Sequence, residues 1–311
     1  MVKTNIKSYI IRIYMAEDNK THIHFILPGG GVNGAFQAGF LYRLFKDCRD
    51  KIIIDRIDGI SVGALNGLAL ILEDIEFIKS IWYYIEDRHT VFNSHNTNSE
   101  IWYKGSIYDS SGLRNIIYMH KEFINKDVMD KYNCVVHNCD TQSYEYINGT
   151  NPNLLDFIIA SASPPIISPY LKIENTFYAD GCLDQIYPID SLMTVDKDTN
   201  QLENNIHKIN VVVGYYDNAN YYLFNIYKTF KRNIYNNNTN IKTLIDTNRI
   251  VTITNPCYYN IIDFSRDNID NGFKLGEEAA IQFYQTHIFK KEPIILPETE
   301  MPTTTTTTNT P

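Results

Sequence analysis

The sequence predicts an α/β protein in which a mostly parallel sheet lies between layers of helices, a three-layer α/β/α fold. Two observations support this class. Two glycine-rich turns, at residues 28–34 and 58–63, each join an apolar, strand-like run to a helix-like run. Strand-like and helix-like runs alternate again after residue 200. Strands that alternate with helices typically pair in parallel, and such sheets place their functional sites at the carboxyl ends of the strands.

The composition is that of a globular protein with one large domain. The chain has 311 residues, of which 44% are hydrophobic and 21% charged, and this balance allows a buried core. We expect one domain over residues 21–297, an N-terminal extension at 1–20 and a disordered threonine-rich tail at 298–311. The first 16 residues lack the pattern of a secretory signal. No run in the sequence approaches the roughly 20 apolar residues of a membrane-spanning helix.

Charge limits the partners. The formal net charge of −8 argues against nucleic acid as a partner, and against electrostatic attraction to anionic membranes. Membrane contact would have to be apolar, through exposed aromatic side chains.

The number and spacing of the cysteines indicate the cellular compartment in which the protein works. The five cysteines have scattered spacing, which fits reduced thiols in the cytoplasm, and without a C-x-x-C pair we expect no metal. These residues are Cys48, Cys134, Cys139, Cys182 and Cys257. The bias towards Ile, Asn and Tyr is associated with AT-rich genomes such as those of large DNA viruses or some protists. If the source is viral, the expected location is the host cytoplasm.

The first glycine-rich turn provides backbone donors for an anion. A strand over residues 22–27 enters it, and a helix over residues 35–46 follows it. Three successive glycines leave their N–H groups free to point at a negative charge. One good donor to an oxyanion lowers a barrier by roughly 3–4 kcal/mol. The candidate oxyanion residues are Gly29, Gly30, Gly31, Val32 and Gly34.

The second turn has the form of a nucleophile elbow. Residues 52–57 predict a buried strand and residues 64–72 an apolar helix, and the G-x-S-x-G pattern lies between them. Such a turn is sharp and strained, so that the hydroxyl of Ser61 would point clear of the backbone. Gly59 and Gly63 lack a Cβ, which lets strand and helix pack closely. The helix N-terminus favours negative charge beside the serine.

The first turn alone also fits a dinucleotide-binding protein. Gly29-x-Gly31-x-x-Gly34 after a strand is the dinucleotide fingerprint, and Asp55 follows Gly34 by 21 residues, near the place of an acidic ribose ligand. The serine elbow favours the hydrolase interpretation, because a nucleotide-binding fold has no use for it.

A third segment lies far downstream, at Phe177-Tyr178-Ala179-Asp180-Gly181-Cys182. With the two turns it resembles the patatin-like phospholipase family, which has a G-G-G-x-x-G oxyanion loop, a G-x-S-x-G elbow and an Asp-Gly-Gly or Asp-Gly-Ala turn that carries the base. The family's A-S-x-x-x-P-type helix end is similar to residues 160–165. The resemblance runs from about residue 22 to about residue 284. Cys182 stands where the family has glycine or alanine, and Asn33 where its loop often has a basic residue.

The resemblance implies a patatin-like three-layer fold and a serine lipid acyl hydrolase of the phospholipase A type. Ser61 would attack the acyl ester, Asp180 would accept its proton, and the glycine loop would bind the oxyanion. Gly181 and Cys182 would complete the acid turn. By resemblance neither calcium nor another cofactor is needed. The expected partner is a lipid or phospholipid, met transiently at a membrane or micelle surface.

Two other functions stay open. A Ser–His–Asp triad of the α/β-hydrolase type needs a histidine after the acid, and His207 and His287 qualify by order. The spacing of 27 residues from Gly34 to Ser61 favours the dyad, because triad enzymes usually separate these two motifs by further strands. The third possibility is a catalytically inactive patatin-like protein that binds lipid or acts as a scaffold, since a motif is not an activity.

The rest of the chain is predicted to complete the sheet and its cover. Residues 74–84 continue helical, with Trp82, Tyr83 and Tyr84 facing the core or a lipid, and the polar stretch 87–112 is a loop suited to a lid. The other expected elements are helices at 113–119, 126–131, 153–163, 220–234 and 268–287, paired strands at 133–137 and 144–147, and strands at 209–213 and 249–254.

Two small clusters have structural interpretations that we prefer to functional ones. His22 and His24 share a strand face and could bind a metal, but a covered or solvated face is the more common role. His137 and Cys139 could form a Cys–His nucleophile, but no partner base accompanies them.

Overall fold

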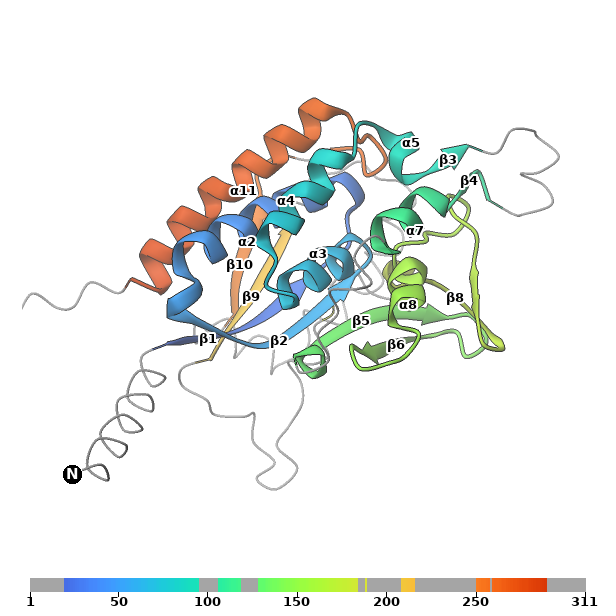
Figure 1. The fold of residues 1–311 in the computed structure, drawn as a ribbon, viewed down its shortest axis with the longest axis horizontal. Coiled ribbons are helices and arrows are strands. Elements are labelled where there is room, and N and C mark those ends of the chain that lie inside the picture. The colour runs from blue at the N-terminus through green and yellow to red at the C-terminus, as the bar shows by residue number, and fades with distance from the viewer. Residues whose placement is uncertain are drawn as a thin grey trace, which may run out of the picture.

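An eight-stranded mixed sheet forms the centre of the molecule (Figure 1). The computed structural model describes residues 20–94, 106–118, 128–183, 188, 208–215, 250–257 and 259–289. The strand order is β10-β9-β1-β2-β5-β8-β7, and β6 also pairs with β5. The strands are β1 (Thr21–Leu27), β2 (Ile52–Ile60), β5 (Tyr132–Asn138), β6 (Ser143–Asn148), β7 (Leu171–Ile173), β8 (Thr176–Asp180), β9 (Lys208–Tyr215) and β10 (Ile250–Asn255).

The pairing of these strands is mostly parallel. β10, β9, β1, β2 and β5 pair in parallel, whereas β6, β7 and β8 form an antiparallel edge. The predicted α/β class with a mostly parallel central sheet is confirmed.

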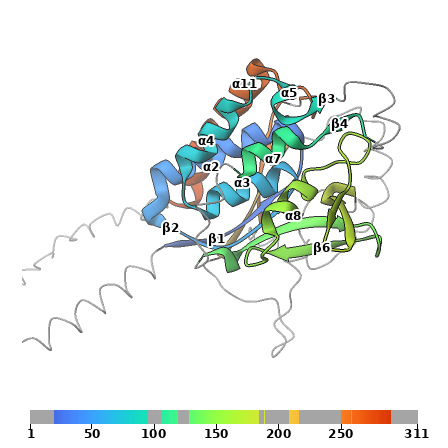
Figure 2. The same cartoon turned by 45° about the vertical axis from the view of Figure 1, so that its right-hand side comes forward.

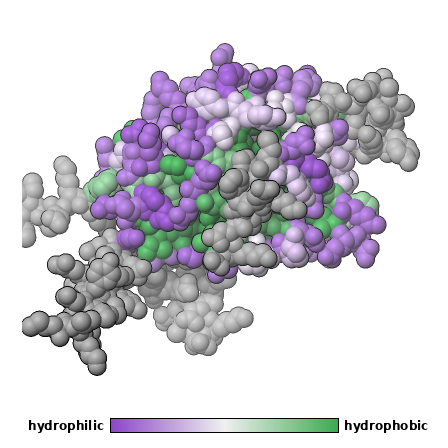
Figure 3. All heavy atoms as spheres, viewed as in Figure 1, coloured by the Kyte–Doolittle hydropathy of each residue, from purple (hydrophilic) through white to green (hydrophobic). Residues whose placement is uncertain are grey.

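Four helices cover one face of the sheet (Figures 1 and 2). They are α2 (Gly34–Cys48), α3 (Val62–Ile71), α4 (Ile75–Tyr84) and α11 (Arg266–His287). β1 shows why the core forms there: the alternating residues Ile23, Phe25 and Leu27 are fully buried and pack with residues of these helices. α11 lies along α2, and the rings of Phe40 and Phe283 meet edge to face at 5.5 Å. The outward surface over α11 is mostly hydrophilic, as expected for a solvent-facing layer (Figure 3).

Shorter elements cover the antiparallel edge. α8 (Leu154–Ser161) packs on β5 and β8, and α7 (Ser111–Tyr118) packs on α8. The stretch 87–112 was predicted to be irregular, and this is wrong for its described part. It contains α5 (Arg88–Val91) and the antiparallel pair β3 (Asn93–Ser94) and β4 (Tyr108–Asp109). Residues 95–105, the centre of the expected lid, lie outside the described residues.

The helix after the elbow is interrupted. α3 ends at Ile71 and α4 begins at Ile75 because the Asp74 carboxylate caps it, accepting the Phe77 N–H at 2.9 Å. Trp82 is buried and donates its ring N–H to Asn66 Oδ1 at 3.0 Å, so it belongs to the core. Its neighbours Tyr83 and Tyr84 are exposed.

Most of the remaining elements agree with their predicted ranges within a few residues. An exception is the helix expected at 126–131, of which residues 129–131 form a 3-10 turn. The expected N-terminal extension (residues 1–19), threonine-rich tail and helix at 220–234 lie outside the described residues, as does His207.

Two His–Asp pairs, one of them buried, join β1 and β2. His24 Nε2 and Asp58 Oδ2 are 2.8 Å apart, and the Arg56 guanidinium donates to the same carboxylate at 2.9 Å. His22 and Asp55 form a second pair at 2.8 Å. The two histidines therefore pair with aspartates of β2. Among the described residues, no group of three potential metal ligands is found.

Candidate active site

Ser61 lies at a sharp turn between β2 and α3. Its backbone has φ 55° and ψ −125°, a strained conformation for a residue with a side chain. Gly63 brings the start of α3 against the end of β1, because a Cβ there would lie 2.0 Å from the Leu27 carbonyl oxygen. Gly59 packs as closely, since its Cβ would lie 2.5 Å from the Gly63 carbonyl oxygen. The turn has the geometry of a nucleophile elbow, with the positive end of α3 directly behind the serine.

Asp180 reaches Ser61 because β2 and β8 share one edge of β5. β6 occupies the opposite edge over residues 133–138. On the shared edge, β2 ends beside Val135, and antiparallel β8 ends with Asp180 beside Val136. The two strands therefore run towards each other and stop at neighbouring residues of β5. Ser61 directly follows β2, and its side chain lies close enough to the Asp180 carboxylate to lower the pKa of that group.

Asp180 is buried and held by its neighbours. Its N–H donates to the Ser163 carbonyl at 3.1 Å, and its Oδ1 accepts the Cys182 N–H at 2.8 Å. Burial raises the pKa of Asp180 from 3.8 to about 6, and hydrogen bonds from Cys182 and Ser61 oppose this rise. Gly181 allows the acid turn to lie close to β5, because a Cβ there would be 2.6 Å from the Val135 carbonyl oxygen.

Ser161 holds the backbone of the elbow by a hydrogen bond. The sequence did not indicate this contact. The Ser161 Oγ accepts the Ser61 N–H at 2.8 Å and donates to the Val135 carbonyl at 2.6 Å. The side chain is fully buried, so it satisfies a backbone donor that water cannot reach. The Ala-Ser run at the end of α8 was noticed, but only as part of a family resemblance. No local pattern relates its hydroxyl to a turn 100 residues earlier.

The glycine loop lies against both the elbow and the acid turn. A Cβ on Gly29 would lie 2.3 Å from the Cys182 Sγ and 3.0 Å from the Ser61 Cβ. Gly31 has φ +55°, and a Cβ there would lie 2.0 Å from the Ile261 carbonyl oxygen. Three segments that are distant in the sequence therefore meet around the serine.

Only part of the loop offers free donors. The Val32 N–H donates to the Ile261 carbonyl at 3.1 Å, and the Gly34 N–H donates to the Gly31 carbonyl. The Gly29 N–H lies near the sulfur of Cys182, where it opposes the rise in the pKa of that thiol. Among the described residues, no partner is found for the N–H groups of Gly30 and Gly31. The five predicted oxyanion residues stay a prediction, and within this set the N–H groups of Val32 and Gly34 are used in the contact with residue 261 and in the local 3-10 turn.

Asn33 explains how the loop is held without a basic residue. Its side-chain amide donates to the carbonyls of Gly30 and Tyr259, each at 3.0 Å, and its Oδ1 accepts the Tyr259 N–H at 3.1 Å. These bonds tie the loop to the segment that precedes α11.

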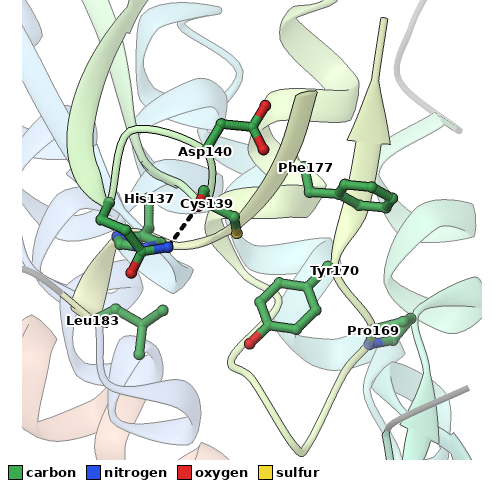
Figure 4. A pocket seen from close by; sticks show the side chains of 8 residues that line it. His137, Cys139, Asp140, Pro169, Tyr170, Phe177 and Leu183 are labelled. Carbon is green, nitrogen blue, oxygen red and sulfur yellow. Dashed lines mark hydrogen bonds between the residues drawn. The ribbon is translucent and has the colours of Figure 1, made fainter. Parts of the chain in front are cut away.

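A cavity of about 510 Å³ lies at the end of β5 (Figure 4). It is lined by His137, Cys139, Asp140, Gln142, Pro169, Tyr170, Phe177 and Leu183. Leu183 ends the acid turn, but neither Ser61 nor Asp180 lines this cavity. The Cys139 N–H donates to the Phe177 carbonyl at 2.9 Å, which joins the β5–β6 turn to β8. This contact agrees with the structural interpretation of the His137–Cys139 cluster.

The residues of the rival interpretations lie elsewhere. His287 is at the last position of α11, where its ring packs on Phe283 at 5.0 Å between centroids. Asp55, the candidate ribose ligand, pairs with His22.

Fold and site together define an α/β protein with a serine at a strand-to-helix elbow and a buried carboxylate beside it. The chain belongs to the patatin-like phospholipase family, because the model of that family matches residues 25–193, more than half of its length. The resemblance seen in the three motifs is thereby confirmed, and the mixed sheet with its packed helices agrees with the three-layer α/β fold of this family. Membership supports lipid acyl hydrolysis at the level of the family.

Other comparisons give more distant likenesses. Twelve chains of solved structures match, among them VipD from Legionella pneumophila. Its sequence is 9% identical, and the match covers 86% of this chain and 67% of that chain with a TM-score of 0.43. A search of the curated proteins gives no match.

Proposed function

We propose that this protein is a serine lipid acyl hydrolase of the phospholipase A type that uses a Ser61–Asp180 dyad. One observation carries the proposal: β2 and β8 end at neighbouring residues of β5, which places Ser61 next to a buried carboxylate whose pKa its side chain lowers. The pKa of this carboxylate is raised to about 6 by burial. Asp180 is then ionised at neutral pH and is a stronger base than an ordinary aspartate.

In the first half of the reaction, Ser61 Oγ attacks the carbonyl carbon of the acyl ester while Asp180 takes the hydroxyl proton. The carbonyl oxygen becomes an oxyanion and accepts hydrogen bonds from the N–H groups of Gly30 and Gly31. The bond to the alcohol oxygen then breaks, and Asp180 returns the proton to that oxygen. A lysolipid leaves, and the acyl group stays as an ester on Ser61.

In the second half, water replaces the alcohol. Asp180 takes a proton from the water as its oxygen attacks the acyl carbon, and the same two N–H groups stabilise the second oxyanion. The bond to Ser61 Oγ then breaks, and the proton passes to that oxygen. A fatty acid leaves and the free serine is restored.

A fluorophosphonate probe tests the nucleophile directly. We expect the wild-type protein to be labelled at Ser61, as mapped by mass spectrometry of the modified peptide. Labelling should be absent in Ser61→Ala and at least about 100-fold slower in Asp180→Asn, because the base is lost. Ser80→Ala, on α4, is the matched control and should label like the wild type. A folded wild-type protein without labelling would contradict the proposal.

The same probe separates the alternatives. A Ser–His–Asp triad predicts that His207→Ala or His287→Ala abolishes labelling, whereas the dyad predicts unchanged rates in both. If the probe labels Ser61, the next experiment is to assay the protein with mixed-chain phosphatidylcholine in micelles as the substrate. Mass spectrometry should then detect a free fatty acid and a lysolipid. Lipid binding by an unlabelled, folded protein would instead support the inactive, lipid-binding interpretation.

Exposed apolar side chains near the acid turn support contact with a lipid surface. Of the described residues, Ile107, Ile166, Tyr170 and Phe177 are among the most exposed large apolar ones, and we call them the apolar rim. Two backbone hydrogen bonds join the segment that carries Ile107 to the segment that carries Ile166. They run from the N–H groups of residues 107 and 108 to the carbonyls of residues 166 and 167. The rings of Tyr170 and Phe177 face the same hollow (Figure 4).

Ile166 is the most exposed member of the rim. It is 68% exposed and has φ 74°, which is unusual for a β-branched residue. The segment that carries it begins beside Ser163, whose carbonyl holds the Asp180 N–H. We therefore propose that the rim inserts into the lipid surface next to the acid turn.

Vesicle flotation tests the rim. With a net charge of −8, binding through the rim should be as strong on phosphatidylcholine vesicles as on vesicles with anionic lipid. Ile166→Glu combined with Phe177→Glu should abolish flotation, and Tyr84→Glu, an equally exposed aromatic on α4, should not. Equal flotation of both variants would contradict the rim.

The remaining parts of the proposal concern the domain and its location. We keep residues 21–297 as the catalytic domain, since α11 at 266–287 packs along α2. All five cysteines are thiols, which supports a cytoplasmic location. Among the described residues, no helix is long and apolar enough to span a bilayer.

A further inference from the structure

Cys182 lies where the glycine loop, the elbow and the acid turn meet. The positions nearest to a Cβ built on Gly29 are the Cys182 Sγ and the Ser61 Cβ, at 2.3 and 3.0 Å. The sulfur therefore fills the space between the loop and the acid turn. A larger side chain at residue 182 would displace the loop, and a smaller one would leave a gap beside the serine.

The Cys182 thiol lies between the acid turn and the glycine loop. It lies close enough to the Asp180 carboxylate to lower the pKa of that group, and the Cys182 N–H donates to the same carboxylate at 2.8 Å. The sulfur also packs against Gly29, whose N–H opposes the rise in the pKa of the thiol. Both the N–H and the thiol of one residue therefore act on Asp180, and that residue also packs against the first glycine of the loop.

The protonation state of the thiol suits a donor and not a nucleophile. Burial, and next the neighbouring Asp180 charge, raise the pKa of Cys182 well above its usual value. The group stays as S–H at neutral pH, and a reactive cysteine would need the thiolate. Cys134 of β5 is another titratable side chain on which the Asp180 charge acts, and burial raises its pKa to about 12, so it too stays neutral.

We propose that Cys182 is a positioning residue of the hydrolase: its thiol aims the Asp180 carboxylate at Ser61 and holds the Gly29 end of the glycine loop in place. This inference rests on the proposed function. In this arrangement the Gly29 N–H lies beside the sulfur, and Gly30 and Gly31 are the expected donors to the oxyanion.

The test compares Cys182→Ala and Cys182→Ser with the wild type. The rate of fluorophosphonate labelling at Ser61 is measured from pH 4 to pH 9. In Cys182→Ala the lost donor should raise the pKa of Asp180, so that the acid limb of the profile moves to higher pH. The plateau rate should fall roughly 10- to 100-fold, because the carboxylate is no longer aimed. Cys182→Ser keeps a donor and should restore the rate, with an acid limb at or below that of the wild type.

A role in packing alone predicts a different result. The gap left by alanine would lower the thermal unfolding temperature, but the acid limb would stay where it is, and serine would not differ from alanine. Superimposable acid limbs in the three proteins would overturn the inference. If Cys182→Ala does not fold, the comparison of Cys182→Ser with the wild type decides, and an acid limb that moves to higher pH in Cys182→Ser overturns the inference.

A titration that does not depend on catalysis separates this inference from the proposed function. The Asp180 carboxyl carbon can be followed by NMR in protein labelled with ¹³C-aspartate, using Asp180→Asn to assign the signal. The pKa of Asp180 should be higher in Cys182→Ala than in the wild type. If wild-type Ser61 does not react with the probe, the proposed hydrolase fails, and this titration still decides whether the thiol holds the carboxylate.

Discussion

The two halves of the candidate dyad are held in different ways. Ser61 is placed by one continuous segment, in which a parallel strand, a strained turn and a helix are forced together by glycines with no room for a Cβ. Asp180 is placed by a short antiparallel strand at the edge of the sheet. Its position depends on hydrogen bonds to residues outside that strand, chiefly Ser163 and Cys182. The elbow is therefore determined by packing, and the acid turn by polar contacts.

This difference predicts which changes damage the fold and which damage the chemistry. Adding atoms to the elbow should destabilise the whole domain, because β1, β2 and α3 have no free space there. Changing the acid turn should leave the sheet intact and alter the ionisation or aim of one carboxylate.

Gly63→Ala should have the largest effect on stability. The added Cβ would lie 2.0 Å from the Leu27 carbonyl oxygen, so the backbone of β1 or α3 must move, at a cost of about 3–5 kcal/mol. Urea unfolding measures the loss. Gly272→Ala in α11 is the control, because the added Cβ would lie 3.3 Å from the nearest atom. Equal stability of the two variants would show that packing does not fix the elbow.

Asp180→Asn should stabilise the protein at neutral pH while it abolishes activity. The folded-state pKa of about 6 lies above the ordinary 3.8. The ionised carboxylate therefore destabilises the folded state above pH 6, and this penalty disappears below about pH 4. Two pKa units correspond to about 3 kcal/mol. Urea unfolding of variant and wild type should show this gain at pH 8 and none at pH 4, and a gain that does not depend on pH would contradict the raised pKa.

Ser161→Ala should lower both the stability of the fold and the reactivity of Ser61. It leaves the Ser61 N–H without its acceptor in a buried place, which costs about 1–3 kcal/mol. Labelling of Ser61 should slow by roughly 10-fold as the elbow relaxes. Ser163→Ala is the matched control, because its Oγ donates to the Ile159 carbonyl of the same helix while its main-chain contact to Asp180 remains. If Ser163→Ala slows labelling as much as Ser161→Ala does, the support of the elbow is not specific.

The pH dependence of the wild type tests the acid turn without any substitution. Labelling should fall about tenfold for each pH unit below about 6, because the base must be ionised and burial raises its pKa to that value. His287→Ala should not move this limb. A labelling rate that falls only near pH 4 would mean that the Asp180 carboxylate is solvated in solution. The contrast between an elbow fixed by packing and an acid turn fixed by polar contacts would then weaken.

The same contrast explains what the sequence could predict. The elbow and the glycine loop are local patterns, and the residues around Ser61 and Gly31 have the backbone geometry that such patterns require. Helix α11 and the hairpin of β5 and β6 were also found, because their periodicity and turn residues are continuous in the chain.

What escaped prediction depends on contacts between distant segments. Nothing local relates Ser161 to Ser61, or the Val32 N–H to the carbonyl of Ile261. The break before α4 was missed because Asp74 was read as part of the helix, although aspartate is a common cap. Asp180 was assigned through its family motif, and only the strand order shows how it arrives beside the serine.

The shared edge of β5 has a practical consequence for dividing the molecule. Cutting the chain in the turn between β5 and β6, at residues 139–142, would give one fragment with the glycine loop and Ser61 and another with Ser161, Asp180 and Cys182. Neither fragment alone would contain an activated serine. On the proposed mechanism, labelling of Ser61 would return only when β5 of the first fragment pairs again with β6 and β8 of the second. The proposed hydrolase would then be suited to a split reporter, in which reconstitution of two inactive pieces is read as the modification of Ser61.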